Sequence, residues 1–155
     1  MRLHTTLIAV TDMAKSKYFY EKALRCQIVM NLDEQNVVFA EGFSLQSMQT
    51  WPKMIRRAAA EISFGSNNMG LVFETEDIDG LMAHLAQFAE VEYLHDVVEM
   101  PWAQRVIRLY DPDKNIIEIG EQMAAVCKRF LQQGLSLEEV SAKTMMPLEY
   151  ITSLD

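Results

Sequence analysis

Apolar and polar residues alternate along the first part of the chain in a pattern that predicts a strand, a helix and then more strands. Residues 3–11 are rich in strand-forming residues and end at Asp12, a residue type that often caps the first turn of a helix. Aromatic and small apolar residues then recur at helical spacing over residues 13–24. Further strands are predicted at 27–32, 37–41 and 43–49, followed by a connector at 51–60 that is helical from Pro52.

The same order of elements begins again in the second part of the chain. Residues 69–75 predict a strand, Asp77 follows as a helix cap in the way that Asp12 does, and residues 78–89 present one apolar face. A strand-helix-strand-strand-strand unit repeated once is the simplest account of this order. The later strands of the second unit are predicted at 91–100, 104–110 and 116–120.

Residues 121–155 differ from the repeat because only helices are predicted there. A helix over 123–133 ends at Gly134, and the Ser136–Glu139 capping box opens a second helix that runs to residue 143. Pro147 suits the first turn of a third helix, which ends near residue 154. We therefore expect two modules, residues 1–60 and 61–122, and an appended helical tail, residues 123–155.

The charge balance argues against binding to nucleic acid or to anionic membranes. The chain has 22 acidic and 14 basic residues and a net charge of −8, which phosphate backbones and anionic lipids repel. No run approaches the roughly 20 apolar residues that span a bilayer, and the N-terminal apolar run is too short for a signal peptide. Cys26 and Cys127 lie far apart in the sequence and form no metal-binding or redox motif. We therefore expect reduced thiols in a cytoplasmic protein.

Several stretches together carry a resemblance to a known family. They are residues 10–12 with Ser16 and the Phe-Tyr pair at 19–20, residues 73–78, and Arg105 with the run from 111 to 121. These residues resemble the vicinal oxygen chelate superfamily, which includes glyoxalase I, bleomycin-resistance proteins and extradiol dioxygenases. The similarity covers about residues 3–121, and the hairpin that leads to Glu118 is its most specific part.

The resemblance implies an α+β fold of two βαβββ modules that form a curved, open, barrel-like sheet around a cavity, with the helical tail outside it. It also implies a homodimer, because such folds often pair. In enzymatic members a divalent metal lies in the cavity. Its ligands are a His or Gln near the start of each module's first strand and a Glu late in each module.

The first ligand position of each module is occupied here by a residue that binds transition metals poorly. These positions fall on Thr5 and Gly70, counted back from the helix-capping aspartates. His4 is adjacent to Thr5, but strand side chains alternate, so His4 points to the opposite face unless a bulge shifts the register. The resemblance therefore predicts that both first ligands are absent.

The late ligand positions are also incomplete. In the first module Ser44 and Gln46 share one face of a predicted strand, and each offers only a weak oxygen ligand. In the second module Glu118 matches its ligand position. One carboxylate and an optional amide do not hold zinc, nickel or iron tightly, so we expect no resident cofactor. The structural alternative for Glu118 is a hydrogen bond to a neighbouring arginine.

Other residues supply candidate ligand contacts. Trp102 offers a rigid face for stacking, and Arg105 can bind a carboxylate in the cavity that Glu118 faces. The alternative is that Trp102 closes the barrel mouth and Arg105 pairs with Glu118 or Asp111. His95 is either a pocket acid or base or a structural residue. The predicted ligand-binding residues are Trp102, Arg105, Glu118, Gln46, Ser44, His95 and, closing the first module's side of the cavity, Trp51.

Two further segments have structural interpretations. Residues 111–115 predict a turn, and the family often has glycine where Lys114 stands; if this position needs a positive φ, lysine costs about 1 kcal/mol there. The tail is similar to the first helices of a helix-turn-helix, but its last helix has no lysine or arginine to contact DNA. Packing against the barrel or a second subunit is the better interpretation.

The sequence leaves three functions open. The first is a small-molecule-binding protein of the glyoxalase and bleomycin-resistance type that sequesters, gives resistance to or senses its ligand without the usual metal. The second is a lyase, isomerase or dioxygenase of the same superfamily, with an unusual metal site built from Glu118 and His4, His95 or Gln46. The third is a regulator that uses the helical tail.

Overall fold

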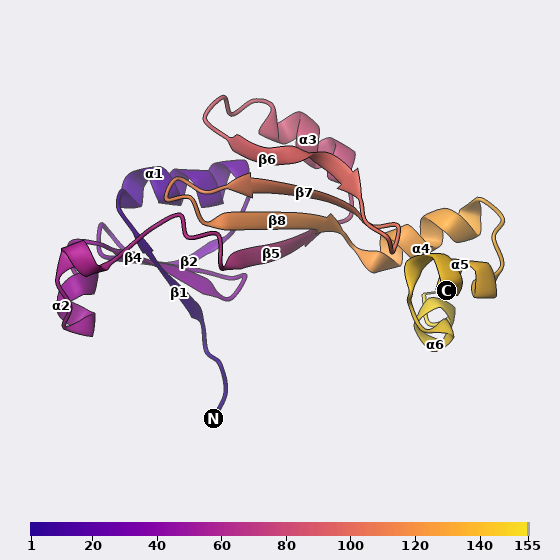
Figure 1. The fold of residues 1–155 in the computed structure, drawn as a ribbon, viewed down its shortest axis with the longest axis horizontal. Coiled ribbons are helices and arrows are strands. Elements are labelled where there is room, and N and C mark those ends of the chain that lie inside the picture. The colour runs from indigo at the N-terminus through magenta and orange to yellow at the C-terminus, as the bar shows by residue number, and fades with distance from the viewer. Residues whose placement is uncertain (155) are drawn as a thin grey trace. The chain divides into compact units, whose positions relative to one another are not determined.

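The computed structural model describes residues 1–154, which form two compact units (Figure 1). Unit one contains residues 1–69, 88–90 and 110–115, and unit two contains residues 70–87, 91–109 and 116–154. Each unit contains one four-stranded sheet. The two βαβββ modules and the helical tail predicted from the sequence are confirmed, and the sheets are not closed into a barrel.

The sheet of unit one has the strand order β1-β4-β3-β2. β1 and β4 run parallel, whereas β3 is antiparallel to both β4 and β2. The order follows from the chain path, because a helix returns the chain after β1 and two tight connections join the remaining strands. The strands are β1 (Thr6–Val10), β2 (Ile28–Leu32), β3 (Asn36–Phe39) and β4 (Phe43–Ser47).

The helix between β1 and β2 begins where the sequence places it. The Asp12 side chain accepts a hydrogen bond from the Lys15 amide at 2.9 Å, so the predicted cap is confirmed. The predicted single helix is in fact α1 (Met13–Tyr18) continued by a π-helical segment, η1 (Phe19–Ala23). Two short helices follow β4, namely α2 (Trp51–Ile55) and the 3-10 turn η2 (Ala59–Glu61).

An aromatic cluster forms the core of unit one. The rings of Phe39 and Phe43 stack at 4.6 Å between centroids, and Tyr20 lies 4.9 Å from Phe43 and 5.8 Å from Phe39. All three side chains are buried. The Tyr20 hydroxyl donates to the carboxylate of Asp111 at 2.8 Å, which satisfies the polar end of a ring that is otherwise in an apolar environment.

Unit two has the strand order β5-β8-β7-β6, with β5 and β8 parallel. Asp77 caps α3 by accepting from the Gly80 amide at 2.8 Å, as predicted. Ile78 and Leu85 of α3 are fully buried, so the helix packs through its apolar face. The elements are β5 (Gly70–Thr75), α3 (Ile78–Leu85), β6 (Glu92–Glu99), β7 (Arg105–Tyr110) and β8 (Ile116–Glu121).

The tail helices belong to unit two and share a small core of their own. Val126, Cys127 and Phe130 pack with Val140 and Ile151, and all five are buried. Ser136 and Glu139 form the predicted capping box, with both reciprocal hydrogen bonds present. The helices are α4 (Met123–Gln132), α5 (Leu137–Thr144) and α6 (Leu148–Thr152). Within residues 1–154, no helix has the length and apolar character needed to cross a bilayer.

The backbone of the turn between β7 and β8 is strained at Lys114, the position where a positive φ was considered in the sequence analysis. Lys114 has φ +67°, so its side chain carries the cost of about 1 kcal/mol expected for an L-residue there. The turn is held by Asp111, which accepts from the amides of Asp113 and Asn115 at 3.0 and 2.8 Å. Gly65 lies against it, since a Cβ at that position would be 3.1 Å from the Lys114 Cβ.

Candidate functional site

One face of the unit-one sheet brings together the polar residues predicted for the first module. The register of β1 and β4 pairs Leu7 with Ser44 and Ala9 with Gln46. Because strand side chains alternate, Ser44 and Gln46 point to the same face, opposite the one that carries Leu45. Ser44 is 3% exposed and Gln46 is 5% exposed. They therefore lie at the floor of this face.

The amide of Gln46 is fully engaged within the protein. Its nitrogen donates to the Gln35 carbonyl at 2.9 Å and to the Thr50 hydroxyl at 2.6 Å. Its oxygen accepts from the Asn36 amide at 3.1 Å. These contacts orient the side chain and leave the oxygen in a hydrogen bond, so coordination of a metal by Gln46 requires the loss of a native contact.

The expected first ligand position of the first module is occupied by Thr5, which is not a strong metal ligand. Thr5 lies just before β1, and its hydroxyl donates to the Gly42 carbonyl at 3.2 Å. His4 also precedes β1 and is exposed, so the alternation that was expected to turn it away from Thr5 does not apply at this position. Neither residue contacts Ser44 or Gln46 through a side-chain hydrogen bond within residues 1–154.

In unit two, the strand register places Glu118 beside the edge strand β5. Val72 pairs with Glu118, and Gly70 pairs with Ile116. Gly70 has no side chain, and a Cβ there would lie 3.3 Å from the Ile116 carbonyl oxygen, so the position favours close backbone approach. Val72 is 68% exposed, which leaves the face around Glu118 open on this side.

Glu118 pairs with Arg108, a residue that the sequence analysis did not select. Arg108 donates from Nε to one carboxylate oxygen, Oε2, at 2.7 Å, and its Nη2 lies 2.6 Å from the same oxygen in an ion pair. The remaining terminal nitrogen, Nη1, lies 3.4 Å from Nε2 of His95. Both charged side chains are slightly less than one-third exposed. The structural alternative for Glu118, a hydrogen bond to a neighbouring arginine, is therefore what the structure shows, and the arginine is Arg108.

His95 completes a row across the unit-two sheet. Its Nδ1 lies 2.7 Å from the Asp96 carbonyl oxygen, which can only accept, so Nδ1 carries a proton. In the neutral ring Nε2 is then an acceptor and faces the Arg108 guanidinium. The order Glu118, Arg108, His95 follows the neighbouring strands β8, β7 and β6. The predicted residues His95 and Glu118 are brought together through Arg108.

Arg105 belongs to a different cluster. It lies three positions from Arg108 on β7, and so on the opposite face of the sheet. Its Nε and Nη2 donate to Glu121 Oε1 at 3.0 and 2.7 Å, and its Nη1 donates to Asp79 at 3.0 Å. Arg129 of α4 also donates to Glu121 Oε1, at 2.8 Å. The structure therefore does not bring Arg105 together with Glu118 or Asp111.

The Glu121 carboxylate is the centre of this second cluster. Burial disfavours its ionised form, but hydrogen bonds from Arg105 and the charges of Arg129 and Arg105 outweigh that effect and lower its pKa. The Arg105 pKa is raised, above all by its hydrogen bond to Glu121. Because the cluster links β7, β8, α3 and α4, its main role is to stabilise the packing of these elements.

The two tryptophans take different positions. Trp102 is half-buried in the β6–β7 turn, and its Nε1 donates to the Gln104 side chain at 2.8 Å. Gln104 in turn donates to the Glu121 carbonyl at 2.7 Å, which fixes this turn against the end of β8. Ala103, between them, has φ +63°. Trp51 is the first residue of α2 and is also half-buried.

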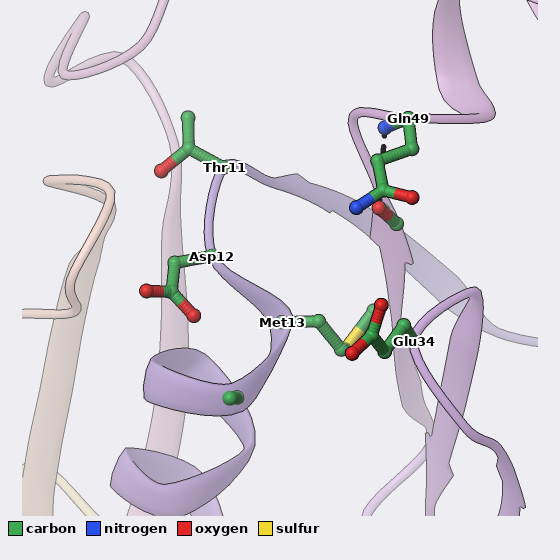
Figure 2. A pocket seen from close by; sticks show the side chains of 7 residues that line it. Thr11, Asp12, Met13, Glu34 and Gln49 are labelled. Carbon is green, nitrogen blue, oxygen red and sulfur yellow. Dashed lines mark hydrogen bonds between the residues drawn. The ribbon is translucent and has the colours of Figure 1, made fainter.

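Two hollows are lined by other residues. The hollow in Figure 2 has a volume of about 250 Å³ and lies in unit one between the start of α1 and the end of β4. The Met13 side chain points toward Glu34 there, whereas Asp12 turns to the other side. A second hollow, of about 400 Å³, lies in unit two beside α4. None of the seven predicted ligand-binding residues lines either hollow.

Arg108 could have been found from the spacing of charges around the turn. Arg108 and Glu118 are each five residues from Asp113, and Arg105 and Glu121 are each eight residues from it. In a hairpin centred on Asp113, residues at equal distances lie opposite each other. The symmetric spacing of these residues about Asp113 therefore predicts two Arg-Glu pairs, one on each face of the sheet.

Comparison with protein families agrees with this fold. The model of the glyoxalase-like domain matches residues 3–124. The chain belongs to the glyoxalase-like domain family. The match includes both modules and ends at the start of α4, so most of the helical tail of this glyoxalase-like protein lies outside it. Among proteins with curated descriptions, none matches the chain.

Several solved structures resemble this glyoxalase-like protein. A protein of unknown function from Agrobacterium tumefaciens is 34% identical, with a TM-score of 0.71 over 79% of this chain and 94% of its own. A glyoxalase/bleomycin resistance protein/dioxygenase family enzyme from Burkholderia phytofirmans has 16% identity and a TM-score of 0.66, covering 78% of this chain and 98% of its own. A lactoylglutathione lyase from Agrobacterium tumefaciens has 21% identity and a TM-score of 0.58, covering 77% and 92%. The last two likenesses establish the fold.

The residues at the expected metal positions do not fit a transition metal. Thr5 and Gly70 provide no strong ligand, and the Gln46 oxygen and the Glu118 carboxylate are held by Asn36 and Arg108. Within residues 1–154, no three His, Cys, Asp or Glu side chains gather closely enough to hold a metal ion. The guanidinium of Arg108 is the cation next to the one carboxylate that matches the family pattern.

Proposed function

We propose that this glyoxalase-like protein binds a small organic molecule against the face of the unit-two sheet that carries Glu118, without a resident metal. The observation that carries the proposal is the Arg108–Glu118 pair. A carboxylate already bonded at 2.6 and 2.7 Å to a guanidinium is a poor metal ligand, because a metal must displace the arginine and leave its charge unpaired.

The polar groups next to this pair define what a ligand meets. Glu118 Oε2 accepts the Arg108 Nε hydrogen bond and also lies nearest to Nη2, so Oε1 has room for a donor. Among residues 1–154, the one polar contact of Arg108 Nη1 is the long 3.4 Å contact with His95, so Nη1 can donate to an oxygen atom of the ligand. Such a surface suits sequestration, resistance or sensing, in which a ligand is held and not converted.

Metal analysis of the purified protein tests the metal-free part of the proposal. The cells are grown with added manganese, iron, nickel and zinc. We expect less than about one-tenth of an equivalent of each metal in wild type and in Glu118→Gln, because a carboxylate held by arginine binds these metals poorly. One equivalent of any of these metals, lost in Glu118→Gln and kept in the matched surface variant Glu76→Gln, supports the alternative of a metal-dependent lyase, isomerase or dioxygenase.

Ligand-observed NMR tests the binding part. A library of small aromatic carboxylates, amides and hydroxyketones is screened against wild type, Arg108→Gln and the exposed-arginine control Arg57→Gln. We expect hits whose saturation-transfer signal falls in Arg108→Gln and persists in Arg57→Gln, because Arg108, unlike Arg57, offers a donor beside Glu118. Hits that are unchanged in Arg108→Gln place binding elsewhere and contradict the proposal.

A further inference from the structure

The hollow beside α4 in unit two is separate from the face that carries Glu118, because it shares no residue with it. Its volume is about 400 Å³. Ala124, Lys128 and Gln132 line it from α4, where they follow one another at four-residue spacing on the side turned away from the buried Val126. The turn between β5 and α3 contributes Glu76 to the lining.

Hydrogen bonds hold the backbone around this hollow. The Gln122 amide, just before α4, donates to the Thr75 carbonyl at 2.9 Å and so ties the start of α4 to the turn that carries Glu76. The Thr75 hydroxyl accepts from the Asp77 amide and donates to the Asp77 carbonyl, both at 3.2 Å, which closes the turn on either side of Glu76. The hollow is therefore preformed, and a ligand orders only the ends of side chains.

Two opposite charges line the hollow without meeting. The side chains of Glu76 and Lys128 are exposed, and neither makes a hydrogen bond or an ion pair in the part of the chain that the structure describes. The carboxylate and the ammonium are therefore more than 4.0 Å apart. This separation leaves room for a molecule between them.

The remaining charges beside the hollow cancel one another. Arg129 also lines it, but its guanidinium donates to Glu121 at 2.8 Å. Arg105 bonds both Glu121 and Asp79, so this cluster contains two cations and two anions. The hollow thus presents one unpaired negative charge, on Glu76, and one unpaired positive charge, on Lys128. A ligand that carries both charges complements both of them.

We propose that this hollow binds a small zwitterion, a molecule with one ammonium and one carboxylate group such as a free amino acid. The ammonium of the ligand pairs with Glu76, and its carboxylate pairs with Lys128. The amides of Gln122 and Gln132 make no side-chain hydrogen bond among the described residues and supply further donors and acceptors.

Other ligand classes match the lining less well. A metal ion needs several oxygen ligands, and Glu76 is the one carboxylate among the residues that line the hollow. A phosphate or a dicarboxylate is attracted by Lys128 but repelled by Glu76. The methyl groups of Ala124 and Ala125 suit the short carbon chain that joins the two charges of a zwitterion.

A two-dimensional amide NMR titration tests the site with glycine, β-alanine and γ-aminobutyrate, which differ in the distance between their charges. We expect at least one of them to shift the Lys128 and Gln132 signals with a Kd of about 1 mM, because exposed ion pairs contribute little each. Butyrate and butylamine each carry one of the two charges. They should bind at least about fivefold more weakly.

Charge reversal identifies the two residues that bind the ligand. Glu76→Lys and Lys128→Glu should each weaken binding by about tenfold, because each variant meets the zwitterion with two like charges. The double variant Glu76→Lys/Lys128→Glu should recover most of the wild-type affinity, since the ligand then binds end for end. Glu90→Lys and Lys53→Glu make the same changes in net charge at exposed positions that do not line the hollow, and should bind as wild type does.

The dispersion of the amide signals checks that each variant is folded. The proposal is overturned when no zwitterion shifts the Lys128 and Gln132 signals at concentrations up to about 50 mM. Butyrate or butylamine binding as tightly as the best zwitterion overturns it as well. A double variant that binds no better than the single reversals has the same meaning.

Discussion

The two modules share a topology but use different chemistry to hold it. Unit one packs the buried rings of Tyr20, Phe39 and Phe43 together, and its buried carboxylates, Asp111 and Asp113, accept hydrogen bonds from neutral donors. Unit two instead places Arg-Glu pairs on both faces of its sheet. A duplicated fold therefore fixes the strand order while leaving each half free to change its side chains. At the late ligand positions that the resemblance implies, unit one has the neutral Ser44 and Gln46 and unit two has Glu118 in an ion pair.

The largest expected effect tests the aromatic half. Phe39→Ala should lower the free energy of unfolding by about 3–5 kcal/mol, because it removes a buried ring that stacks on Phe43 and leaves a cavity. Urea denaturation followed by circular dichroism measures the loss. Tyr18→Ala, at a tyrosine that is 49% exposed, is the control and should cost much less. Equal losses in the two variants would show that the cluster is not the main source of stability in unit one.

The next effect tests the charged half. Glu121→Gln should lower the free energy of unfolding by about 2 kcal/mol, less than for a fully buried pair because Arg105 and Arg129 are about 30% exposed. The substitution leaves two guanidinium groups without their shared carboxylate. Asp79→Asn provides the comparison: Asp79 is 78% exposed, and its pair with Arg105 should contribute less than about 1 kcal/mol. An Asp79→Asn loss as large as that of Glu121→Gln would contradict this ranking.

Acid should act on the two halves in opposite directions. The Glu121 pKa is lowered, so its contribution to stability is present above the ordinary glutamate pKa and is lost as pH falls through the lowered value. Burial raises the pKa of Asp111 against its hydrogen bonds, so its contribution favours folding at low pH and is lost as pH rises through the raised value.

Urea denaturation at about pH 7 and about pH 4 measures both contributions. The loss of stability on acidification should be smaller in Glu121→Gln than in wild type, because the glutamine cannot be protonated in this range. It should be larger in Asp111→Asn, which removes the group that gains from protonation. Identical pH dependence in all three proteins would contradict the assigned directions.

The smallest effect separates the two Arg-Glu pairs. Glu118→Gln should lower the free energy of unfolding by less than about 1 kcal/mol, since both Glu118 and Arg108 are partly exposed and water screens their attraction. A thermal melt of Glu118→Gln beside Glu121→Gln measures the difference. A larger loss in Glu118→Gln would assign the Glu118 pair a structural role and weaken the proposal that this face is kept for a ligand.

Much of the fold could be predicted because local signals agree with it. Asp12 and Asp77 each end a strand and cap a helix, and the Ser136–Glu139 capping box opens α5. The π-helical segment at Phe19–Ala23 could not be predicted, because its apolar spacing is also that of an ordinary helix. Strand ends differ by at most three residues from the prediction, since hydrogen bonds to neighbouring strands decide them.

The candidate site was less predictable because it depends on pairing between strands. In the sequence, Glu118 and Gln46 are the residues nearest to the family's ligand pattern. The prediction that Arg105 lies in the same cavity as Glu118 is wrong, because alternation over three positions puts Arg105 on the other face. The position of Arg108 opposite Glu118 follows only once the hairpin register is fixed. Roles for Trp51, Trp102 and His95 in ligand binding stay predictions.

The contacts of the β7–β8 turn have a consequence for how the protein folds during synthesis. Thr11 and Ser16 bond Asp113, and Tyr20 bonds Asp111, across sequence separations of 91 to 102 residues. A ribosome that has made the whole first module has not yet made these acceptors, so the buried Tyr20 hydroxyl has no partner on the nascent chain. Unit one is therefore completed late, after much of unit two has emerged, and this delay exposes its aromatic residues to chaperones.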